Sequence, residues 1–350
     1  MSVIFNALNF YPEIVGNGKY TSEMIFWISK RVDKVIVITT NPYYPEWVCP
    51  ENKYKKEILD NITIFRCPIY VPKKVNGFTK ILHYLSFSLT SFPIALYSLR
   101  YKPKLIFTIC PSIFSVTSSL AICIISKVFL KKKVFSWIHF QDLEIEAAFN
   151  LNILRGKNLK KVILSFEKYI INKFDFISSI SNSMVEKIKL KLIKNKEIIL
   201  FPNFIKTSDF KVNYKSKLNN PFIKDLSIDG KLKIIMYSGT LNEKLSYKTL
   251  TKTISLLNKN NILWIISGEG PLKKKLQKNL SAYKNVIFTS FQPEEKFVDW
   301  IHLADIHLIP QRINTLDLLL PSKLLAILSS GKPIVGFATK DSDLGRILDN

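Results

Sequence analysis

The sequence predicts an α/β protein made of two tandem Rossmann-like, doubly wound domains. Three observations support this prediction. The chain of 350 residues is too long for one ordinary core and suits two domains. Short apolar runs alternate with segments of helical period, and this alternation stops at residues 206–231 and then restarts. Apolar residues make up 47% and charged residues 22% of the chain, as in ordinary globular proteins.

A β-α-β unit opens the chain. An apolar run at residues 3–9 predicts the first strand, a segment of helical period follows, and residues 34–39 predict the second strand. The turn after the first strand contains Gly16 and Gly18, but it is neither a GxGxxG fingerprint nor a Walker A motif. Two glycines allow the backbone to approach a phosphate or a sugar closely, and a plain flexible turn explains them equally well.

The loop at residues 41–47, NPYYPEW, is dense in aromatic residues and prolines. Exposed Tyr and Trp side chains would suit a sugar ring or a lipid headgroup zone, whereas buried ones would pack the loop onto the core. The N-terminus has no basic region and meets Pro12 too early for a signal peptide, so a cytoplasmic protein is expected.

Residues 61–141 contain no Asp or Glu but eleven Lys and Arg. Within them, the apolar segment 81–99 is near the length that spans a membrane, yet Pro93 and several Ser and Thr argue against a span. We favour a basic, aromatic-rich face that lies on an anionic membrane surface. A nucleic-acid partner is disfavoured because no RNA- or DNA-binding motif accompanies the charge, and a solvated lysine-rich surface explains part of the net charge of +24.

A strand at residues 134–138 leads to His139 and Asp142. Residues just past the carboxyl end of a parallel strand occupy the crevice where open α/β sheets bind ligands, so both are candidate catalytic residues. A lone histidine is more often structural than catalytic. A helix near 160–173 and strands at 176–179 and 198–201 complete the first domain, predicted as residues 1–205.

The polar segment 206–231 is the predicted linker, and residues 232–350 form the predicted second domain. Its expected strands lie at residues 233–238, 263–267, 286–289 and 306–309, with glycine-bearing turns after the first two. These turns contain Gly239 and then Gly268, Glu269 and Gly270. Because each turn follows a strand and precedes a helix, helix N-termini that bind phosphate would gather at one edge of this domain.

Residues 308–335 predict a strand, a polar loop, a Pro-Ser-Lys turn that opens a helix, and a last strand. Ser322 is a good N-cap residue, so the helix N-terminus and the Lys323 ammonium would lie together and favour an anion. A capped helix that merely joins two strands is the alternative. The four cysteines are far apart and form no CxxC pair, and the scattered histidines form no metal pair, so no metal site and only reduced thiols are expected.

Nine segments together resemble a known family, the retaining glycosyltransferases of the two-lobed GT-B type, family 4, and within them the colanic-acid-type fucosyltransferases. They occur in the family's order over nearly the whole chain: NFYPEIVGNGKYTSEM, TTNPYYPEW, RCPIYVPK, IHFQDLE, SSISNSM, FPNF, YSGTLNEK, SGEGP and LPSKLLAILSSGKPIV. The resemblance implies two lobes that face a central cleft. Members of the family continue through a final helix that packs back across the first lobe, so this chain is expected either to be a fragment or to lack that element.

The resemblance also implies roles for the candidate residues. The second lobe would bind a nucleoside-diphosphate sugar as co-substrate, without a metal or other cofactor. His139 would face the donor sugar and Asp142 would lie near the acceptor. The positions that match donor-binding residues are Gly16, Gly18, Gly239, Lys244, Gly268, Glu269, Gly270, Arg312, Ser322 and Lys323. Fixed cations would stabilise the departing diphosphate, and no pair of carboxylates indicates a covalent intermediate of the hydrolase kind.

The chain departs from the family's pattern at three positions. Leu318 and Ala326 stand where many members carry two glutamates, the later one on the nucleotide ribose, and Thr240 stands where an arginine is usual. Ribose recognition is therefore expected to differ. The resemblance implies transfer of a hexose or a deoxyhexose, such as fucose or N-acetylfucosamine, to a polyprenyl-diphosphate-linked glycan at the inner face of the cytoplasmic membrane. The alternative is a non-catalytic nucleotide-sugar-binding protein on the membrane surface.

Overall fold

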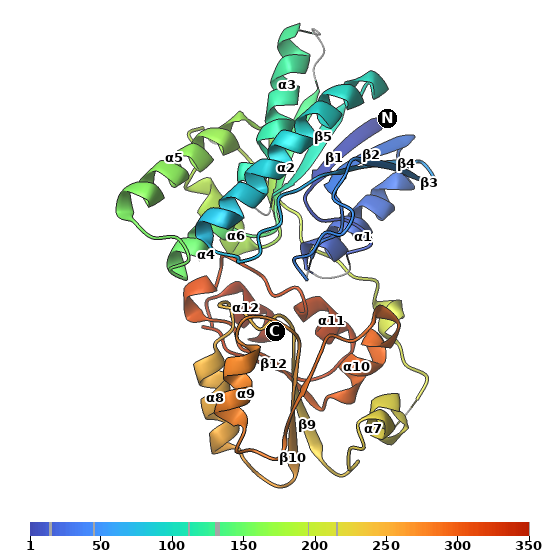
Figure 1. Cartoon of the computed structure of the whole chain (residues 1–350), viewed down its shortest axis with the longest axis vertical. Helices are drawn as coiled ribbons and strands as arrows, with labels where there is room; N and C mark the ends of the chain where they lie inside the picture. The colour runs from blue at the N-terminus through green and yellow to red at the C-terminus, as the bar shows by residue number, and fades with distance from the viewer. Residues whose placement is uncertain are drawn as a thin grey trace. The chain divides into compact units, whose positions relative to one another are not determined.

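The structure is a computed structural model that describes residues 1–13, 16–44, 46–110, 113–129, 134–194, 196–214 and 216–349. The chain divides into two compact units, Met1–Asn203 (unit 1) and Phe204–Asn350 (unit 2). Each unit has a mainly parallel β-sheet with helices packed against it (Figure 1). The predicted α/β class with two doubly wound units is confirmed.

The sheet of unit 1 has eight strands within the described ranges, in the order β3-β4-β2-β1-β5-β6-β7-β8. All neighbouring strands are parallel except the β3–β4 hairpin. The strands are β1 Ser2–Ala7, β2 Lys34–Thr40, β3 Lys55–Leu59, β4 Ile62–Cys67, β5 Leu105–Cys110, β6 Phe135–Phe140, β7 Phe176–Ser179 and β8 Ile198–Leu200. The central strands are apolar and buried because helices cover both faces of a parallel sheet.

The helices of unit 1 follow the strands with short connections. They are α1 Asn17–Ser29, α2 Gly77–Ser98, α3 Thr117–Phe129, α4 Glu144–Asn150, α5 Lys157–Lys173 and α6 Asn182–Lys189, with 3-10 turns η1 Leu99–Tyr101 and η2 Ile113–Ser115. Local side chains fix some starts: Asn76 and Thr79 form a capping box at α2, and Ser181 caps α6.

Helix α2 contains the apolar segment that the sequence placed near the spanning threshold. Its inner face is buried, with Phe87 and Ala95 in the core, while Phe78 and Leu89 on the outer face are 69% and 75% exposed. Among the described residues, none of the helices combines the length and apolar character that crossing a membrane requires.

Unit 2 has five parallel strands in the described part of the chain, in the order β11-β10-β9-β12-β13. The strands are β9 Lys233–Ser238, β10 Ile262–Ser267, β11 Val286–Thr289, β12 Ile306–Ile309 and β13 Ile334–Gly336. The helices are α7 Pro221–Asp225, α8 Tyr247–Leu256, α9 Lys273–Leu280, α10 Phe297–Leu303, α11 Leu324–Ser329 and α12 Asp343–Asp349, with 3-10 turns η3 Thr207–Phe210, η4 Lys217–Asn219, η5 Glu294–Lys296 and η6 Ile313–Thr315.

The expected linker, residues 206–231, contains η3, η4 and α7 and packs on unit 2. Phe222 of α7 contacts Trp300 of α10, with ring centroids 4.8 Å apart, and both side chains are buried. Phe210 is buried beside Ile301. The segment therefore differs from a free linker, because its few apolar side chains are anchored in the core of unit 2.

The strand order of each sheet reverses direction next to its first strand. In unit 1 the chain runs outward from β1 on both sides, and in unit 2 it does so from β9. Ligands of open α/β sheets bind outside the carboxyl ends of the strands at such a point. The loops after β9 and β12 flank this point in unit 2.

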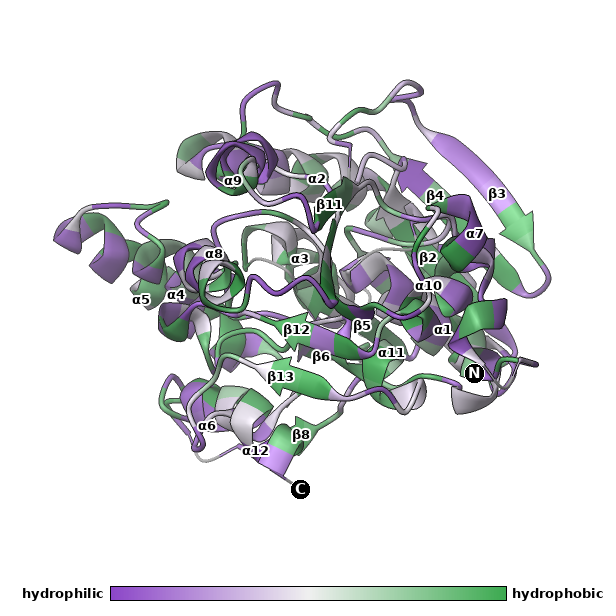
Figure 2. Ribbon diagram, turned by 90° about the horizontal axis from the view of Figure 1, so that it is seen from below, coloured by the Kyte–Doolittle hydropathy of each residue, from purple (hydrophilic) through white to green (hydrophobic). Residues whose placement is uncertain are grey.

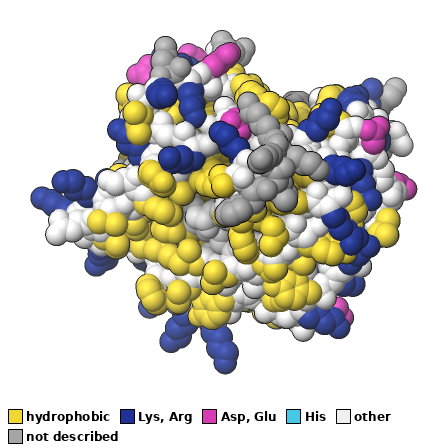
Figure 3. Space-filling view, turned by 90° about the horizontal axis from the view of Figure 1, so that it is seen from above, with side chains coloured by type: hydrophobic (Ala, Val, Ile, Leu, Met, Phe, Trp, Pro, Cys, Tyr) yellow, Lys and Arg dark blue, Asp and Glu magenta, His cyan; other side chains and the backbone are white. Residues whose placement is uncertain are grey.

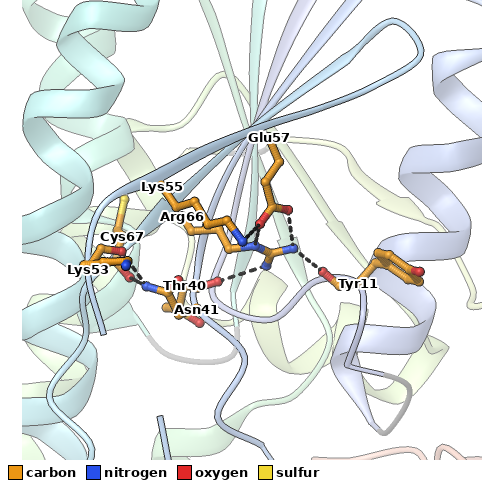
Figure 4. Close-up of polar contacts among 8 residues, drawn as sticks. All are labelled: Tyr11, Thr40, Asn41, Lys53, Lys55, Glu57, Arg66 and Cys67. Atoms are coloured by element: carbon orange, nitrogen blue, oxygen red, sulfur yellow. Dashed lines mark hydrogen bonds and ion pairs between the residues drawn. The ribbon is translucent and has the colours of Figure 1, made fainter. Parts of the chain in front are cut away.

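The sequence analysis did not predict the β3–β4 hairpin. Strand β3 is an edge strand that begins with hydrophilic residues, whereas β12 and β13 are mostly hydrophobic (Figure 2). Arg66 on β4 is buried and donates to both carboxylate oxygens of Glu57 on β3, at 2.9 Å each. The same guanidinium donates to the carbonyls of Thr40 and Tyr11 (Figure 4). Arg66 thus joins the hairpin to the loop after β1.

We expect Arg66→Met to lower the free energy of unfolding by about 2–4 kcal/mol, because Glu57 and two backbone carbonyls would lose a partner. Arg66 lowers the pKa of Glu57 from its ordinary value of 4.5 through their hydrogen bond. This contribution is present above pH 4.5 and is lost as the pH falls through the lower pKa of the folded state, so the difference between parent and variant should shrink in acid. Urea unfolding at several pH values measures it.

The matched control is Lys55→Met, since Lys55 also faces Glu57, at 3.2 Å, but is half exposed. Its replacement should cost less than about 1 kcal/mol. Equal effects of the two substitutions would contradict the role assigned to Arg66.

Candidate functional site

The loops after β9 and β12 pair with each other at the carboxyl edge of unit 2. Leu245 and Gln311 form an isolated antiparallel bridge, and the amide of Arg312 donates to the carbonyl of Lys244 at 3.0 Å. These two loops leave the strands at the point where the strand order reverses. The pairing therefore brings together Lys244 and Arg312, which lie 68 positions apart in the sequence.

The Arg312 guanidinium lies near the carbonyl and the carboxylate of Glu243, at 3.4 and 3.5 Å. Both side chains of this ion pair are well exposed, so the pair is weak and a ligand anion could compete for the guanidinium. Lys244 is half-buried, and its amide donates to Asn242 Oδ1 at 3.0 Å. Two predicted donor-binding cations thus lie on one short piece of paired backbone.

The predicted glycine turns of unit 2 contact each other directly. A Cβ atom on Gly268 would lie 2.0 Å from the carbonyl oxygen of Gly239, and one on Gly270 would lie 2.4 Å from that of Leu241. All three glycines have φ between +140° and +154°, a conformation that other residues rarely adopt. This close contact between the turns accounts for the glycines without a ligand.

Glu269 lies between the two glycines of the second turn. Its carbonyl accepts from the Leu241 amide at 2.8 Å, and its exposed carboxylate pairs with Lys273 of α9 at 2.6 Å. Hydrogen bonds with Lys273 and Ser290 lower the pKa of this carboxyl. The residue is ionised and points to solvent at the same edge.

Lys323 lies beside the first glycine turn. Its Nζ atom is 3.6 Å from the centroid of the Tyr237 ring and would be 2.9 Å from a Cβ atom on Gly239. Burial lowers the pKa of Lys323 to about 7. The structure therefore brings Lys323 and Gly239 together, as the sequence predicted.

The predicted N-cap role of Ser322 is wrong. Helix α11 begins at Leu324 with Lys323 in the N-cap position, and no side chain caps it. The amide of Leu324, which a Ser322 cap would bind, donates instead to the carbonyl of Pro321 at 3.0 Å. With six residues the helix is too short to attract an anion by itself, so the positive charge at this point is that of Lys323.

Leu318 and Ala326 are both buried in unit 2, at 4% and 3% exposure. Neither position presents a polar group, and Ala326 packs with Phe210 and Ile301. The two residues that replace the usual glutamates are therefore ordinary members of the apolar core.

The glycine turn of unit 1 is shaped by Glu13. A Cβ atom on Gly18 would lie 2.8 Å from the carbonyl oxygen of Glu13, and Gly16 has φ +61°. The buried carboxylate of Glu13 accepts from the amides of Tyr43 and Tyr44, at 2.8 and 2.9 Å, and thereby ties the turn to the aromatic loop. Burial raises the pKa of Glu13, although these amides oppose the shift.

The aromatic loop packs onto the core of unit 1. Tyr43 is 4% exposed, and its ring lies 4.8 Å from that of His83 and 5.6 Å from that of Trp47. Of the two alternatives for this loop, the structure shows the one in which the aromatic side chains pack onto the core. Pro45 lies outside the described residues.

His139, on β6, is 1% exposed and both of its ring nitrogens are occupied. Nδ1 lies 2.8 Å from Ser178 Oγ, and Nε2 lies 3.0 Å from the amide nitrogen of Gln141. Gln141 in turn forms a reciprocal amide pair with Asn203. Burial lowers the pKa of His139 to about 3, so the imidazole is neutral at physiological pH and acts here as a hydrogen-bonding group.

Asp142 follows in the next turn and is half-buried at the carboxyl edge of unit 1. The helix behind it, α4, is held on two sides. Glu144 forms an ion pair with Lys80 and accepts from the Tyr84 hydroxyl at 2.6 Å, and Glu146 forms an ion pair with Lys191. These ion pairs fix the start of α4 and with it the loop that contains Asp142.

Sequence reasoning missed Tyr237, Gln141 and Asn203. All three lie in segments that carry the family resemblance, YSGTLNEK, IHFQDLE and FPNF, but no chemical signal within those segments singles them out. Their roles depend on contacts with residues distant in sequence. Within the described ranges, no group of three or more His, Cys, Asp or Glu side chains is arranged to hold a metal ion, and the four cysteines are free.

We expect the His139 imidazole to show no titration between pH 5 and 8.5, because burial keeps it neutral. NMR chemical shifts of the imidazole CH groups measure this, and His139→Gln identifies the signal. His83 and His307, whose pKa values burial lowers to about 4, should also stay constant. A titration midpoint near 6.5 for His139 would show that solvent reaches the ring and would contradict the buried, neutral imidazole.

A model of the family described as Glycosyl transferases group 1 matches residues 219–341. Over its full length the chain is 30% identical to a protein of Escherichia coli (strain K12) described as a putative colanic acid biosynthesis glycosyl transferase, WcaI. That alignment spans 358 residues and covers 100% of this chain and 86% of the relative.

Solved structures share the fold at low identity. Sucrose-phosphate synthase from Thermosynechococcus elongatus aligns with a TM-score of 0.69 and 11% identity, covering 96% of this chain and 81% of that one. Anabaena HepE in complex with UDP and glucose aligns with a TM-score of 0.65 and 10% identity, covering 100% and 88%. These likenesses concern the fold, which is GT-B. Together with the full-length relative, they show that this chain belongs to the group 1 glycosyl transferases, family 4 of the GT-B type, and is a glycosyltransferase.

Proposed function

We propose that this glycosyltransferase moves a deoxyhexose, such as fucose or N-acetylfucosamine, from a nucleoside-diphosphate sugar to a polyprenyl-diphosphate-linked glycan. The reaction proceeds with retention of anomeric configuration and without a metal ion, and it contributes to a surface polysaccharide. The name of the E. coli relative and the complex of HepE with UDP and glucose support the reaction class and the donor class.

The observation that supports the donor site best is the pairing of the loops after β9 and β12. It presents Lys244 and Arg312 together at the carboxyl edge of unit 2, beside Gly239 and Lys323. When a glycosyl phosphate bond breaks, negative charge grows on the leaving diphosphate. Fixed cations at this edge stabilise that charge without reorganisation, which lowers the barrier. In the proposed reaction the acceptor hydroxyl attacks the sugar, the glycosyl phosphate bond breaks, and the leaving phosphate takes the proton of that hydroxyl.

We expect Lys244→Met and Arg312→Met each to lower kcat/KM about 10²–10³-fold, because each removes a charge from the leaving group. The assay offers UDP-, GDP-, dTDP- and ADP-hexoses with a polyprenyl-diphosphate-linked acceptor and detects the elongated product. Lys278→Met, an exposed lysine of α9 in the same unit, is the control and should transfer at the parental rate. Donor binding without transfer to any acceptor would favour the non-catalytic binding protein instead.

We further propose that unit 1 lies on an anionic membrane surface through α2 and α5. One face of α2 carries the exposed apolar residues Phe78, Leu82, Leu85, Leu89 and Leu96. The exposed apolar residues of α5 also follow one face and are Leu159, Val162, Phe166 and Tyr169. Phe114 of η2, which packs against α2, stacks on Phe166 of α5 with ring centroids 6.0 Å apart, so η2 links the two helices.

The charges around these faces favour anionic lipid. Residues 61–173 contain four acidic side chains, and three of them, Glu144, Glu146 and Glu167, form ion pairs that leave their side chains 3–19% exposed. The lysines of α5 are all exposed and are Lys157, Lys160, Lys161, Lys168 and Lys173. Figure 3 shows a face where hydrophobic side chains gather, with Lys and Arg side chains at its margins. Lys131, Lys132 and Lys133, which the sequence analysis included, lie outside the described residues.

We expect Leu89→Glu combined with Val162→Glu to reduce binding to vesicles of phosphatidylcholine and phosphatidylglycerol at least about tenfold, since two exposed apolar side chains would no longer enter the lipid. Flotation measures the bound fraction. The matched control is Leu256→Glu in unit 2, a leucine 71% exposed, which should bind like the parent. If the parent binds vesicles of pure phosphatidylcholine equally well, and salt does not weaken the binding, the proposed attraction to anionic lipid is contradicted.

A further inference from the structure

Among the residues that the structure describes, the Lys323 ammonium has no counter-ion. In the part of the chain that the structure describes, no hydrogen bond or ion pair reaches Nζ, and its one close partner is the face of Tyr237. Other lysines of unit 2 form ion pairs: Lys217 pairs with Asp305, and Lys273 pairs with Glu269. A lysine half-buried in this way usually finds a carboxylate or a carbonyl, because an unpaired ammonium loses hydration.

Tyr237 gives the ammonium a defined position. The residue is 5% exposed at the carboxyl end of β9, and its hydroxyl donates to the carbonyl of Thr240 at 2.8 Å. This hydrogen bond fixes the ring beneath the turn that begins at Gly239. A cation over the face of a tyrosine is attracted by the ring's negative face, so the ring orients Nζ without neutralising it.

Residues 239–242 of the turn contain no charged side chain, and Gly239 leaves room for the ammonium. A Cβ atom on Gly239 would lie 2.9 Å from Nζ, so a larger residue would displace the lysine. The Lys323 charge acts on His307 of β12, which burial keeps neutral. Among the described residues, burial is the cause that lowers the pKa of Lys323.

We propose that Tyr237 is a positioning residue that holds the Lys323 ammonium at the Gly239 turn as a binding group for a phosphate of the donor, and that this phosphate supplies the missing counter-ion. The inference rests on the proposed function, because it takes the diphosphate of a nucleotide sugar as the ligand. It adds Tyr237 and the Thr240 carbonyl to the site and makes donor binding depend on a proton.

The sign of that dependence follows from the charge. Without a ligand, burial holds the pKa of Lys323 at about 7, so the side chain is largely neutral above that pH. A phosphate beside Nζ favours the charged form and raises the pKa, so binding takes up a proton. Affinity for the diphosphate should therefore be greatest below pH 7 and fall as the pH rises above it.

Isothermal titration calorimetry with UDP-glucose and GDP-mannose, at pH 6.0 to 8.5, tests the proposal. The diphosphates of these sugars do not titrate in this range, so they contribute no pH dependence of their own. The parent should bind at least about tenfold more weakly at pH 8.5 than at pH 6.0, and buffers of different ionisation enthalpy should reveal proton uptake. Lys323→Met should bind about 10–100-fold more weakly at pH 6.0 and show no such slope.

Three further variants test the charge of the lysine and the position of the ring. Lys323→Arg, which stays charged, should flatten the pH profile. Tyr237→Leu should weaken binding about 3–30-fold through loss of the cation–π contact, and Tyr237→Phe, which keeps the ring but loses the hydrogen bond to Thr240, should lie between Tyr237→Leu and the parent. Lys332→Met, at another partly buried lysine of unit 2, is the control and should keep the parental affinity and slope.

Circular dichroism melting confirms that each variant is folded. If the parent binds a donor and Lys323→Met binds it equally well with the same slope, the inference is overturned while the proposed function stands. If the parent binds none of the nucleotide sugars of the transfer assay, the proposed donor site fails, and the inference fails with it.

Discussion

The contact between the two glycine turns of unit 2 is the constraint on which the candidate donor site depends. Gly268 and Gly270 let the loop after β10 approach the backbone of Gly239 and Leu241, and the amide of Leu241 and the carbonyl of Glu269 bond across them. A side chain at either glycine would separate the turns. Because the turns touch, the Gly239 turn is fixed where Tyr237 and Lys323 meet it. The site is thus built on backbone packing before any ligand is considered.

The charged side chains at the carboxyl edges of the two units are paired to different extents. In unit 1 the acidic side chains point inward, and Lys191 bridges the carboxylates of Glu146 and Glu167. Burial raises the pKa of Glu167, while the charge of Lys191 opposes the shift. In the described part of unit 2, Arg312 has only an exposed ion pair with Glu243, and no ion pair reaches Lys323. These two cations leave positive charge available for an anion at this edge.

His139 of unit 1 forms hydrogen bonds but does not exchange protons at physiological pH, because burial lowers its pKa. His139 lies in a chain of hydrogen bonds that runs from Trp137 through Ser178 to Gln141 and Asn203. Such a network orients each member, and burial keeps the imidazole neutral. A neutral group of this kind can position the loop beside it, while the proposed function assigns the charge for the reaction to lysine and arginine.

The sequence by itself determined the fold class and the strands of unit 2, because β9, β11 and β12 are short apolar runs bounded by turn residues, and their type depends on local pattern. It also determined that glycines, Lys244 and Lys323 follow strand ends, which share one edge in any parallel sheet. Only the tertiary structure decided that β3 and β4 form a hairpin closed by Arg66, that Ser322 does not cap α11, and that residues 206–231 pack on unit 2. It alone placed the Lys323 ammonium on Tyr237 with no carboxylate beside it. These features arise from contacts between residues far apart in the chain, whose free energies no local pattern encodes.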